Sequence, residues 1–323
     1  MKIFITGATG FIGTHLTKLL VETGHEVTAL LRTEAKKKNL PSKVEVIKGD
    51  LSLFEDENLK LPAFDVVIHL AGVIFEKNKA GYYKYNFHAV EHIVNCLKRQ
   101  DWKLKRFVFA SSLAAAGPSN PDVPMLETDI PNPVDHYGGA KLASEKFLET
   151  VAEFAHTSFR PAIVLGPGDE NSLTLFKMAK GHLGVNIDGK PQYMSFVDVD
   201  DLNDGILKMV EDDTNANRKF FVSHPDRASN VLIFKTLEKV MNTKVFLIPL
   251  PKFVLFGAMK ASTLVSSVFG IKNQLDEKQY NQLLNHFVCS GKALTTQLGW
   301  SPKHNLESSA KKAYEGYKAQ GWI

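Results

Sequence analysis

Several features that mark special classes of protein are scarce in this chain of 323 residues. It holds two cysteines, Cys96 and Cys289, whose spacing matches neither a disulfide framework nor a metal site. Two isolated cysteines favour a reducing compartment, so we expect a cytoplasmic protein without a bound metal. We expect no signal peptide, because the N-terminus leads directly into an apolar strand.

The chain also has little excess of positive over negative charge. The formal net charge is +4, and the one run of basic residues, Lys36–Lys38, lies in an expected loop. A run of this length is explained by an ordinary solvated surface. We therefore expect no nucleic-acid partner.

Apolar runs long enough to span a membrane are lacking. The most apolar stretch, residues 245–271, is interrupted by Pro249, Pro251, Lys252 and Lys260, so stable membrane insertion is not expected. Its apolar side chains include Phe253, Phe256, Leu264 and Phe269. Either these dock on a membrane surface or the segment is a helix packed over a substrate pocket, and we favour the pocket.

Strand-like and helix-like segments alternate over the first half of the chain, whose composition is that of an ordinary globular protein. Strands are expected at residues 2–5, 26–31, 44–47, 64–70, 107–110 and 159–165, and helices at 11–22, 82–99 and 136–156. This order predicts right-handed crossovers and an α/β fold with a Rossmann-type, doubly wound parallel sheet. Ligands of such sheets bind at the carboxyl ends of the strands.

The alternation weakens beyond Gly168. Residues 195–202 and 220–223 are expected to return to the main sheet, and the rest indicates a smaller mixed C-terminal lobe that covers the cleft. We therefore expect a dinucleotide-binding domain at 1–165, to which 196–224 returns, and a substrate-binding lobe at 166–195 and 225–323.

A glycine-rich turn, Thr6–Gly13, joins the first strand to the first helix. Gly7, Gly10 and Gly13 leave its backbone N–H groups open to a ligand, and the helix beyond has a positive dipole end. Glycines for a tight turn, for close approach and for helix–strand packing are typical of a dinucleotide-binding turn. A glycine-rich loop without a ligand is the alternative, and the ordered strands and helix around the turn argue against it.

Tyr137 and Lys141 are four residues apart at the start of an expected helix, so both lie on one face. A free tyrosine has a pKa of about 10, and a neighbouring ammonium is expected to lower it. Such a pair can pass a proton to or from a substrate oxygen. A core tyrosine and a surface lysine on an amphipathic helix would show the same spacing.

Ser112 strengthens the hypothesis of an acid–base site. It follows the strand at 107–110, so its hydroxyl is expected at a carboxyl end, within reach of the same substrate oxygen. Ser111 competes for this role. Capping of loop backbone is the structural alternative for either serine.

Together with further motifs, these residues resemble the extended short-chain dehydrogenase/reductases, also called the NAD-dependent epimerase/dehydratase family. The matching residues, in the family's order, are Thr6-Gly7-x-x-Gly10-x-x-Gly13, Gly49-Asp50-Leu51, His69-Leu70-Ala71-Gly72, Asn86, Ser111-Ser112 with Gly117, Tyr137-x-x-x-Lys141, Arg160-Pro161, Gly166-Pro167-Gly168 and Phe196-Val197-Asp198-Val199-Asp200-Asp201. These motifs are specific for fold and cofactor and much less specific for substrate.

The resemblance implies a role for each matching residue. The catalytic group would be Ser112, Tyr137, Lys141 and Asn86, with Tyr137 as the proton donor or acceptor and Lys141 on the nicotinamide ribose. The cofactor-binding residues would be Gly7, Thr9, Gly10, Phe11, Ile12, Gly13, Arg32, Asp50, Leu51, Leu70, Ala71, Gly72, Tyr137, Lys141, Pro161 and Ile163. Within this set, Asp50 and Leu51 would flank the adenine, and Pro161 and Ile163 would lie near the nicotinamide face.

The end of the second strand indicates which dinucleotide is bound. An acidic residue there usually holds the adenosine ribose and repels a 2′-phosphate, but this position aligns with Leu31, followed by Arg32. A guanidinium suits a phosphate. We therefore predict NADP as the preferred cofactor, with NAD as the other candidate. The alternative is a solvated Arg32 with Glu34 on the ribose.

Three functions are compatible with the resemblance. The first is hydride transfer between NADP(H) and a poorly polar carbonyl or alcohol, as in dihydroflavonol-reductase-like and 3β-hydroxysteroid-dehydrogenase-like members. It is favoured by Arg32, by the apolar second lobe, and by Met194-Ser195 where sugar-nucleotide epimerases commonly carry an arginine. The second is a nucleotide-sugar epimerase or dehydratase with tightly bound NAD. The third is a non-catalytic cofactor-binding protein, which we disfavour because such relatives often lose the tyrosine.

The expected partners are a small-molecule substrate and a second copy of the chain. Many relatives pair through two long helices, which here match Tyr82–Arg99 and His136–His156. We therefore expect a homodimer with a four-helix interface, although polar residues on both helices also suit exposed surfaces.

Overall fold

A computed structural model describes residues 1–269, 275 and 277–323. Within this part of the chain, seven parallel strands form the main sheet, in the order β10-β6-β5-β4-β1-β2-β3. The strands are β1 (Lys2–Thr6), β2 (Glu26–Leu31), β3 (Glu45–Lys48), β4 (Val66–His69), β5 (Arg106–Ala110), β6 (Ala155–Pro161) and β10 (Arg218–Val222). The order reverses between β1 and β4, so the predicted doubly wound parallel sheet is confirmed.

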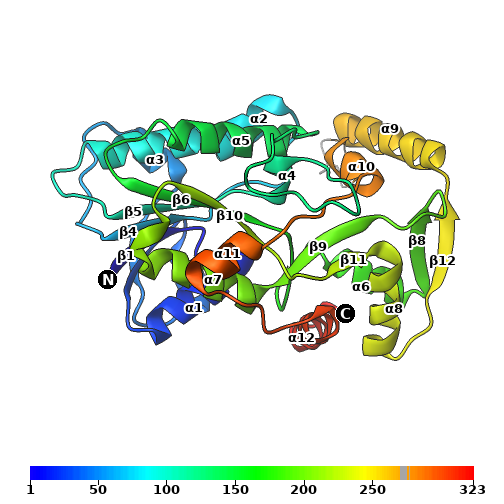
Figure 1. The fold of residues 1–323 in the computed structure, drawn as a ribbon. Coiled ribbons are helices and arrows are strands. Elements are labelled where there is room, and N and C mark those ends of the chain that lie inside the picture. The colour runs from blue at the N-terminus through cyan, green and yellow to red at the C-terminus, as the bar shows by residue number, and fades with distance from the viewer. Residues whose placement is uncertain (270–274, 276) are drawn as a thin grey trace.

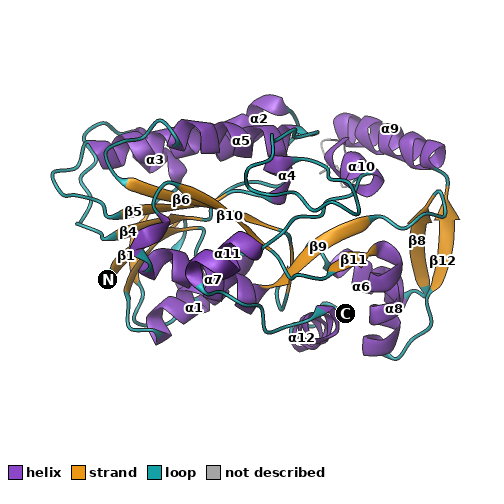
Figure 2. Cartoon of the chain, in the orientation of Figure 1, coloured by secondary structure: helices purple, strands orange, loops and turns teal. Residues whose placement is uncertain are grey.

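Helices cover both faces of this sheet (Figures 1 and 2). One face packs against α1 (Phe11–Glu22), α7 (Val199–Glu211) and α11 (Lys292–Leu298), around a core that includes Leu16, Leu202 and Leu294. The other face packs against α3 (Ala89–Lys98) and α5 (His136–Leu148), around Ile93 and Leu148. Because both faces are covered, the central strands are apolar runs without alternation.

A smaller mixed lobe follows the main sheet. Its three-stranded sheet has the order β11-β9-β7 and its two-stranded sheet pairs β12 with β8. These strands are β7 (Ile163–Leu165), β8 (Leu183–Ile187), β9 (Tyr193–Asp198), β11 (Arg227–Ser229) and β12 (Phe246–Leu250). Its helices include α6 (Leu173–Lys180), α8 (Asn230–Met241), α9 (Lys252–Phe269), α10 (Glu277–Leu284) and α12 (Leu306–Ala319).

Two predicted elements around β6 are wrong in extent. The helix expected at 136–156 ends at Leu148, and a strand begins at Ala155. The first half of β6 is polar in sequence, yet His156, Thr157 and Ser158 are buried in the sheet, so its pattern did not resemble a strand. The strand expected at 159–165 is split, because β6 ends in the main sheet and β7 begins the smaller one.

The segment at 195–202 does not return to the main sheet as expected. Its first half belongs to β9, which pairs with β7 and β11, and its second half opens α7. The segment at 220–223 does return, because β10 pairs with β6 at the sheet edge. An apolar strand pattern alone does not reveal which of two sheets a strand joins.

The helix expected at 82–99 is longer and irregular. It begins with α2 (Lys79–Tyr83), passes through a π-helical turn at Lys84–His88 and continues as α3. Such turns insert an extra residue and are frequent at functional sites.

The apolar stretch at 245–271 forms β12 and α9, and its last two residues lie outside the described part of the chain. α9 packs against α10, where the rings of Phe256 and Tyr280 lie 5.7 Å apart. Among the described residues, no helix is both long and apolar enough to cross a membrane.

Candidate active site

The glycine-rich turn lies after β1, where the order of the sheet reverses. Gly7 has a φ of +79°, and a Cβ atom there would lie 2.7 Å from the backbone nitrogen of Ala71. A Cβ atom at Gly13 would lie 2.1 Å from the carbonyl oxygen of Gly7. These distances exclude side chains, so Gly7 lets the turn approach the segment after β4, and Gly13 lets α1 approach the turn.

The N-terminus of α1 is suited to an anion. Gly10 is its N-cap residue and provides no side-chain hydrogen bond, and the first helical turn holds no acidic residue. Backbone N–H groups and the positive dipole end therefore remain for a dinucleotide pyrophosphate, which the turn fits. Thr9 is half-buried before the helix, Phe11 packs beside Gly166, and Ile12 packs against the main core.

Ser112 and Tyr137 meet because α4 (Leu113–Ala116) and α5 pack with their backbones nearly in contact. A Cβ atom at Gly138 would lie 2.2 Å from the carbonyl oxygen of Ala114, so a glycine is required there. Ser112 is the N-cap residue of α4, and its side chain also hydrogen bonds to Tyr137. Asp135 caps α5 by accepting from the Gly138 N–H at 2.7 Å.

Lys141 lies one turn beyond Tyr137 and is buried. Its Nζ atom donates to the carbonyl oxygen of Ala110 at 2.8 Å and lies 5.9 Å from the centre of the Tyr137 ring. A Cβ atom at Gly72 would lie 3.2 Å from Lys141 Nζ and 2.7 Å from Asn86 Oδ1. The ends of β4 and β5, the π-helical turn and α5 therefore converge on one small space.

Asn86 is fully buried in the π-helical turn. Its amide nitrogen donates to the carbonyl oxygens of Val73 and Tyr82, both at 3.0 Å, and its Oδ1 atom accepts from the Val73 N–H at 3.2 Å. Ser144 Oγ of α5 donates to the Asn86 carbonyl oxygen at 2.6 Å. Asn86 thus connects the segment after β4 to the helix that carries Tyr137 and Lys141.

Burial sets the protonation of the two central residues. Desolvation raises the pKa of Tyr137 to about 12, against a smaller lowering by the hydrogen bond with Ser112. Desolvation lowers the pKa of Lys141 to about 7, while the nearby Glu145 carboxylate opposes this shift. The expected lowering of the tyrosine pKa is therefore wrong for this structure, because the Lys141 amine is hydrogen-bonded to Ala110 and is itself desolvated.

The ends of β2 and β3 carry the residues expected near the adenosine. Hydrogen bonds from Ser52 lower the pKa of the Asp50 carboxyl, and the charge of Arg32 contributes further. Asp50 accepts from the Ser52 N–H at 2.9 Å and from Ser52 Oγ at 2.6 Å, and Leu51 is half-buried beside it. Arg32 and Glu34 are both exposed, so the preference for a phosphorylated ribose remains a prediction.

Pro161 ends β6 at the same edge of the sheet. Ile163 and the next residue, Val164, lie in β7 and point to opposite sides of it. Ile163 faces an apolar cavity of about 40 Å³ in the smaller lobe, which Phe196 and Leu237 also line. Val164 points to the opposite side and packs against the main core, as Ile12 and Leu70 do. Alternation along β7 explains the difference between the two side chains, and the expected contact of Ile163 with the nicotinamide stays a prediction.

A buried ion pair beneath the site was missed by sequence analysis. Arg160 of β6 donates to Glu145 of α5 through Nε at 2.8 Å and Nη2 at 2.6 Å, and both side chains are about 1% exposed. Ser111, the competitor of Ser112, donates its hydroxyl to Glu145. Because Tyr137, Lys141 and Glu145 are spaced four residues apart, their common helix face could have indicated this pair.

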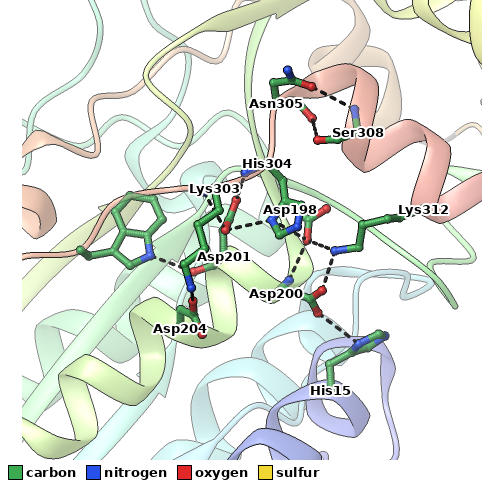
Figure 3. Close-up of polar contacts among 11 residues, drawn as sticks. His15, Asp198, Asp200, Asp201, Asp204, Lys303, His304, Asn305, Ser308 and Lys312 are labelled. Atoms are coloured by element: carbon green, nitrogen blue, oxygen red, sulfur yellow. Dashed lines mark hydrogen bonds and ion pairs between the residues drawn. The ribbon is translucent and has the colours of Figure 1, made fainter.

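A second polar group joins α12 to the main body (Figure 3). Lys312 donates to Asp198 at 2.8 Å and to Asp200 at 2.5 Å, and Asp200 lies 3.6 Å from His15 of α1. Ligand atoms of Asp198, Asp200 and His304 lie within 4.8 Å of one another, close enough for a metal ion. The Lys312 ammonium already contacts both carboxylates, so the group is better described as an electrostatic connection between lobes.

A model of the NAD dependent epimerase/dehydratase family matches residues 3–222 of this chain. The matched range includes the glycine-rich turn, Ser112 and the Tyr137–Lys141 pair. The roles of these residues remain predictions.

Curated relatives cover nearly the whole chain. UDP-glucose 4-epimerase of Vibrio cholerae is 26% identical over 98% of this chain and 95% of its own length. Ceramide reductase of Caulobacter vibrioides is 24% identical over 99% of this chain and 96% of its own.

Solved structures of this family share the fold. The UDP-glucuronic acid 4-epimerase of Bacillus cereus, solved with UDP-glucuronic acid and NAD, aligns with a TM-score of 0.78 at 20% identity, over 99% of this chain and 100% of its own. At this identity the likeness shows the fold alone. The family assignment rests on the match over residues 3–222. This chain belongs to the NAD dependent epimerase/dehydratase family, the extended short-chain dehydrogenase/reductases, and is an enzyme of that family.

Proposed function

We propose that this enzyme transfers a hydride between NADP(H) and a poorly polar carbonyl or alcohol. The observation that carries the proposal is the phenol of Tyr137, which is protonated at neutral pH, has a pKa raised to about 12 by desolvation, and hydrogen bonds to Ser112 at the carboxyl end of β5. A protonated phenol is the form that can donate to a carbonyl oxygen.

The residues of the chain divide the work as follows. The turn Gly7–Gly13 would hold the pyrophosphate, Asp50 and Leu51 would flank the adenine, and Lys141 would hold the nicotinamide ribose. When bound, the nicotinamide would supply the hydride for reduction or accept it for oxidation. In the direction of reduction, Ser112 would donate a hydrogen bond to the substrate oxygen and Tyr137 would give this oxygen its proton. The products would be the alcohol, the oxidised dinucleotide and a Tyr137 phenolate that regains its proton from solvent.

The surroundings of the expected substrate position favour a poorly polar molecule. Ser195, which stands beside the position of the epimerase arginine, is buried and donates to the carbonyl oxygen of Cys289 at 3.2 Å. Cys289 packs with Leu113 and Phe221, and Met125 and Phe287 pack against them. This cluster is apolar, which suits a poorly polar substrate better than a diphosphate.

A nucleotide-sugar epimerase is the second candidate, and the relatives favour it. The Vibrio cholerae relative and the Bacillus cereus structure are both named as UDP-sugar epimerases. The ceramide reductase relative, which covers the same length, favours the first candidate. Both reactions use the same serine, tyrosine and lysine, so the site geometry permits either.

One experiment separates the two candidates. The purified enzyme is given NADPH with a panel of apolar ketones and aldehydes, and separately NAD with UDP-glucose and UDP-glucuronic acid. We expect substrate-dependent NADPH oxidation with at least one carbonyl and no change in the UDP-sugars. Conversion of a UDP-sugar to its 4-epimer without net change of the cofactor would reverse the assignment.

The cofactor preference rests on Arg32. Replacing Arg32 with Ala removes the guanidinium, so we expect the KM for NADPH to rise about tenfold and the KM for NADH to change little. The neighbouring Glu34→Ala is the control for the alternative ribose ligand. An unchanged preference in Arg32→Ala, with a lost preference in Glu34→Ala, would contradict the phosphate role.

We also propose the division into two lobes and a homodimer. Residues 1–165 with 196–224 would bind the dinucleotide, and 166–195 with 225–323 would select the substrate. The dimer would form through the π-helical turn, α3 and α5, where the half-buried rings of Phe87 and Phe147 lie 6.4 Å apart. Light scattering of the wild type and of Phe87→Glu tests this, and we expect the variant to be monomeric.

A further inference from the structure

Exposed apolar side chains gather on β12 and α9, away from the residues of the candidate site. Exposure reaches 73% for Phe253 and 65% for both Phe246 and Leu264. The β12–α9 surface is defined by Phe246, Ile248, Phe253, Val254, Phe256, Leu264 and Val265. Single exposed apolar residues are ordinary, whereas a concentration on two consecutive elements marks an interaction surface.

α9 carries apolar side chains on its exposed face as well as on its buried face. Its inner face carries buried Leu255 and Met259 and, further along the same side, half-buried Ser262 and Ser266. Its outer face carries Phe253, Leu264 and neighbouring apolar residues. A surface helix usually turns its polar side to water, so the outer face of α9 is suited to an apolar environment.

The charges around this surface are mainly positive. From residue 239 to residue 275 the sequence contains lysines and no aspartate or glutamate, and Lys244, Lys252 and Lys260 are exposed. The nearby Asp188 accepts from the backbone N–H of Lys252 at 2.9 Å, at the N-terminus of α9. An apolar helix face with basic residues at its border matches the negative potential of an anionic lipid surface.

A second copy of the chain is a poorer match for the same surface. Two copies related by a two-fold axis would bring the lysines of one near the lysines of the other, and no acidic residue of β12 or α9 could pair with them. Like charges at an interface are unfavourable.

We propose that the β12–α9 surface rests on an anionic lipid bilayer, with α9 lying in the plane of the interface. α9 lies at the end of the molecule opposite β1, next to α10 (Figure 1). Asn281 of α10 donates to the carbonyl oxygen of Val134 at 3.0 Å, three residues before Tyr137. α10 therefore connects α9 to the segment that precedes α5. The docking itself does not depend on the proposed reaction.

Sedimentation with vesicles tests the proposal on the full chain. Vesicles of phosphatidylcholine alone are compared with vesicles that contain phosphatidylglycerol, at low and high salt. We expect binding to the anionic vesicles that weakens with salt, and a loss of about tenfold or more in Phe253→Ser/Leu264→Ser and in Lys252→Glu/Lys260→Glu. Circular dichroism and cofactor binding show whether each variant remains folded.

The matched control is Lys36→Glu/Lys37→Glu, which changes the net charge equally on an exposed turn after β2. We expect its vesicle binding to stay within about twofold of wild type. The proposal is overturned if the wild type stays in solution with all vesicles, or if both lysine pairs weaken binding equally. It is also overturned if the apolar variant turns a dimer into a monomer without affecting sedimentation. None of these results depends on turnover, so the proposed reaction is tested separately.

Discussion

Burial acts in opposite directions on the two central side chains. It raises the pKa of Tyr137 to about 12 and lowers that of Lys141 to about 7, so each is shifted toward its neutral form. A neutral phenol is ready to donate a proton. A lysine near its pKa at neutral pH responds strongly to a neighbouring hydroxyl or phenolate. The proposed reaction therefore begins with a protonated tyrosine rather than a phenolate.

Tyr137→Phe removes this proton donor and little volume. We expect kcat to fall by about 100-fold or more, while the dissociation constant for the dinucleotide stays within about twofold. Turnover and fluorescence titration of the cofactor measure the two quantities. Tyr314→Phe, on the remote α12, is the control and should behave as the wild type. Near-normal turnover in Tyr137→Phe would show that another group donates the proton.

Lys141 makes stability depend on pH. Its ordinary pKa of 10.5 applies in the unfolded chain, whereas the folded protein releases this proton near pH 7. Between pH 7 and pH 10.5 the unfolded chain binds more protons than the folded protein, so the free energy of unfolding rises with pH. Lys141→Met removes the ammonium group, whose charge lowers the free energy of unfolding when it is buried. We expect it to raise the Tm clearly at pH 6 and less at pH 10.

The Tm comparison is made on cofactor-free protein by calorimetry. Lys146→Met, on the exposed side of the same helix, is the matched control and should show no such trend with pH. A Tm gain of Lys141→Met that is equal at both pH values would mean that the lysine is not desolvated in the folded state.

At the scale of elements, α5 is the structure that positions the site. It carries Tyr137 at its start, Lys141 one turn later and Glu145 one turn after that. The Glu145–Arg160 pair fastens this helix to β6, and Gly138 lets its first turn touch α4. The position of Tyr137 beside Ser112 therefore depends on contacts at both ends of α5.

A double-mutant cycle tests the ion pair. Glu145→Leu or Arg160→Met alone leaves a buried charge without its partner, so we expect each to lower the free energy of unfolding by about 3–5 kcal/mol. The double replacement leaves no unpaired charge and should cost much less than the sum. Urea denaturation of the four proteins measures the cycle, and additive costs would contradict the pairing.

Elements with strong local signals were predicted well. The bounds of α1 and β2 are those expected, because glycines and apolar periodicity mark both ends. The strand beginning at Ala155 was not predicted, since its polar residues are buried by tertiary contacts that no local pattern records. The π-helical turn around Asn86 was also not predicted, because an inserted residue leaves the apolar spacing nearly unchanged.

At the scale of the whole molecule, the family pattern predicted which distant segments meet. Ser112, Tyr137, Lys141, Asn86 and Gly72 come together as the resemblance implies, although four different elements supply them. The role of Ile163 remains untested, and the Arg160–Glu145 pair was missed because it joins two segments through their buried sides. The roles of the assembled residues remain predictions.

The two lobes are connected by charged side chains as well as by the chain. Lys312 of α12 donates to the buried Asp198 at the end of β9. His304 lies 3.1 Å from Asp201 of α7. These contacts hold α12 and the loop before it to β9 and α7, where the smaller lobe meets the main body.

A crystal structure of the enzyme with NADPH tests the central claim most directly. The account predicts the pyrophosphate on the turn Gly7–Gly13, the ribose within hydrogen-bond distance of Lys141 Nζ, and the Tyr137 hydroxyl directed at the space beside the nicotinamide ring. A dinucleotide bound elsewhere, or a nicotinamide ring far from the Tyr137 hydroxyl, would contradict it.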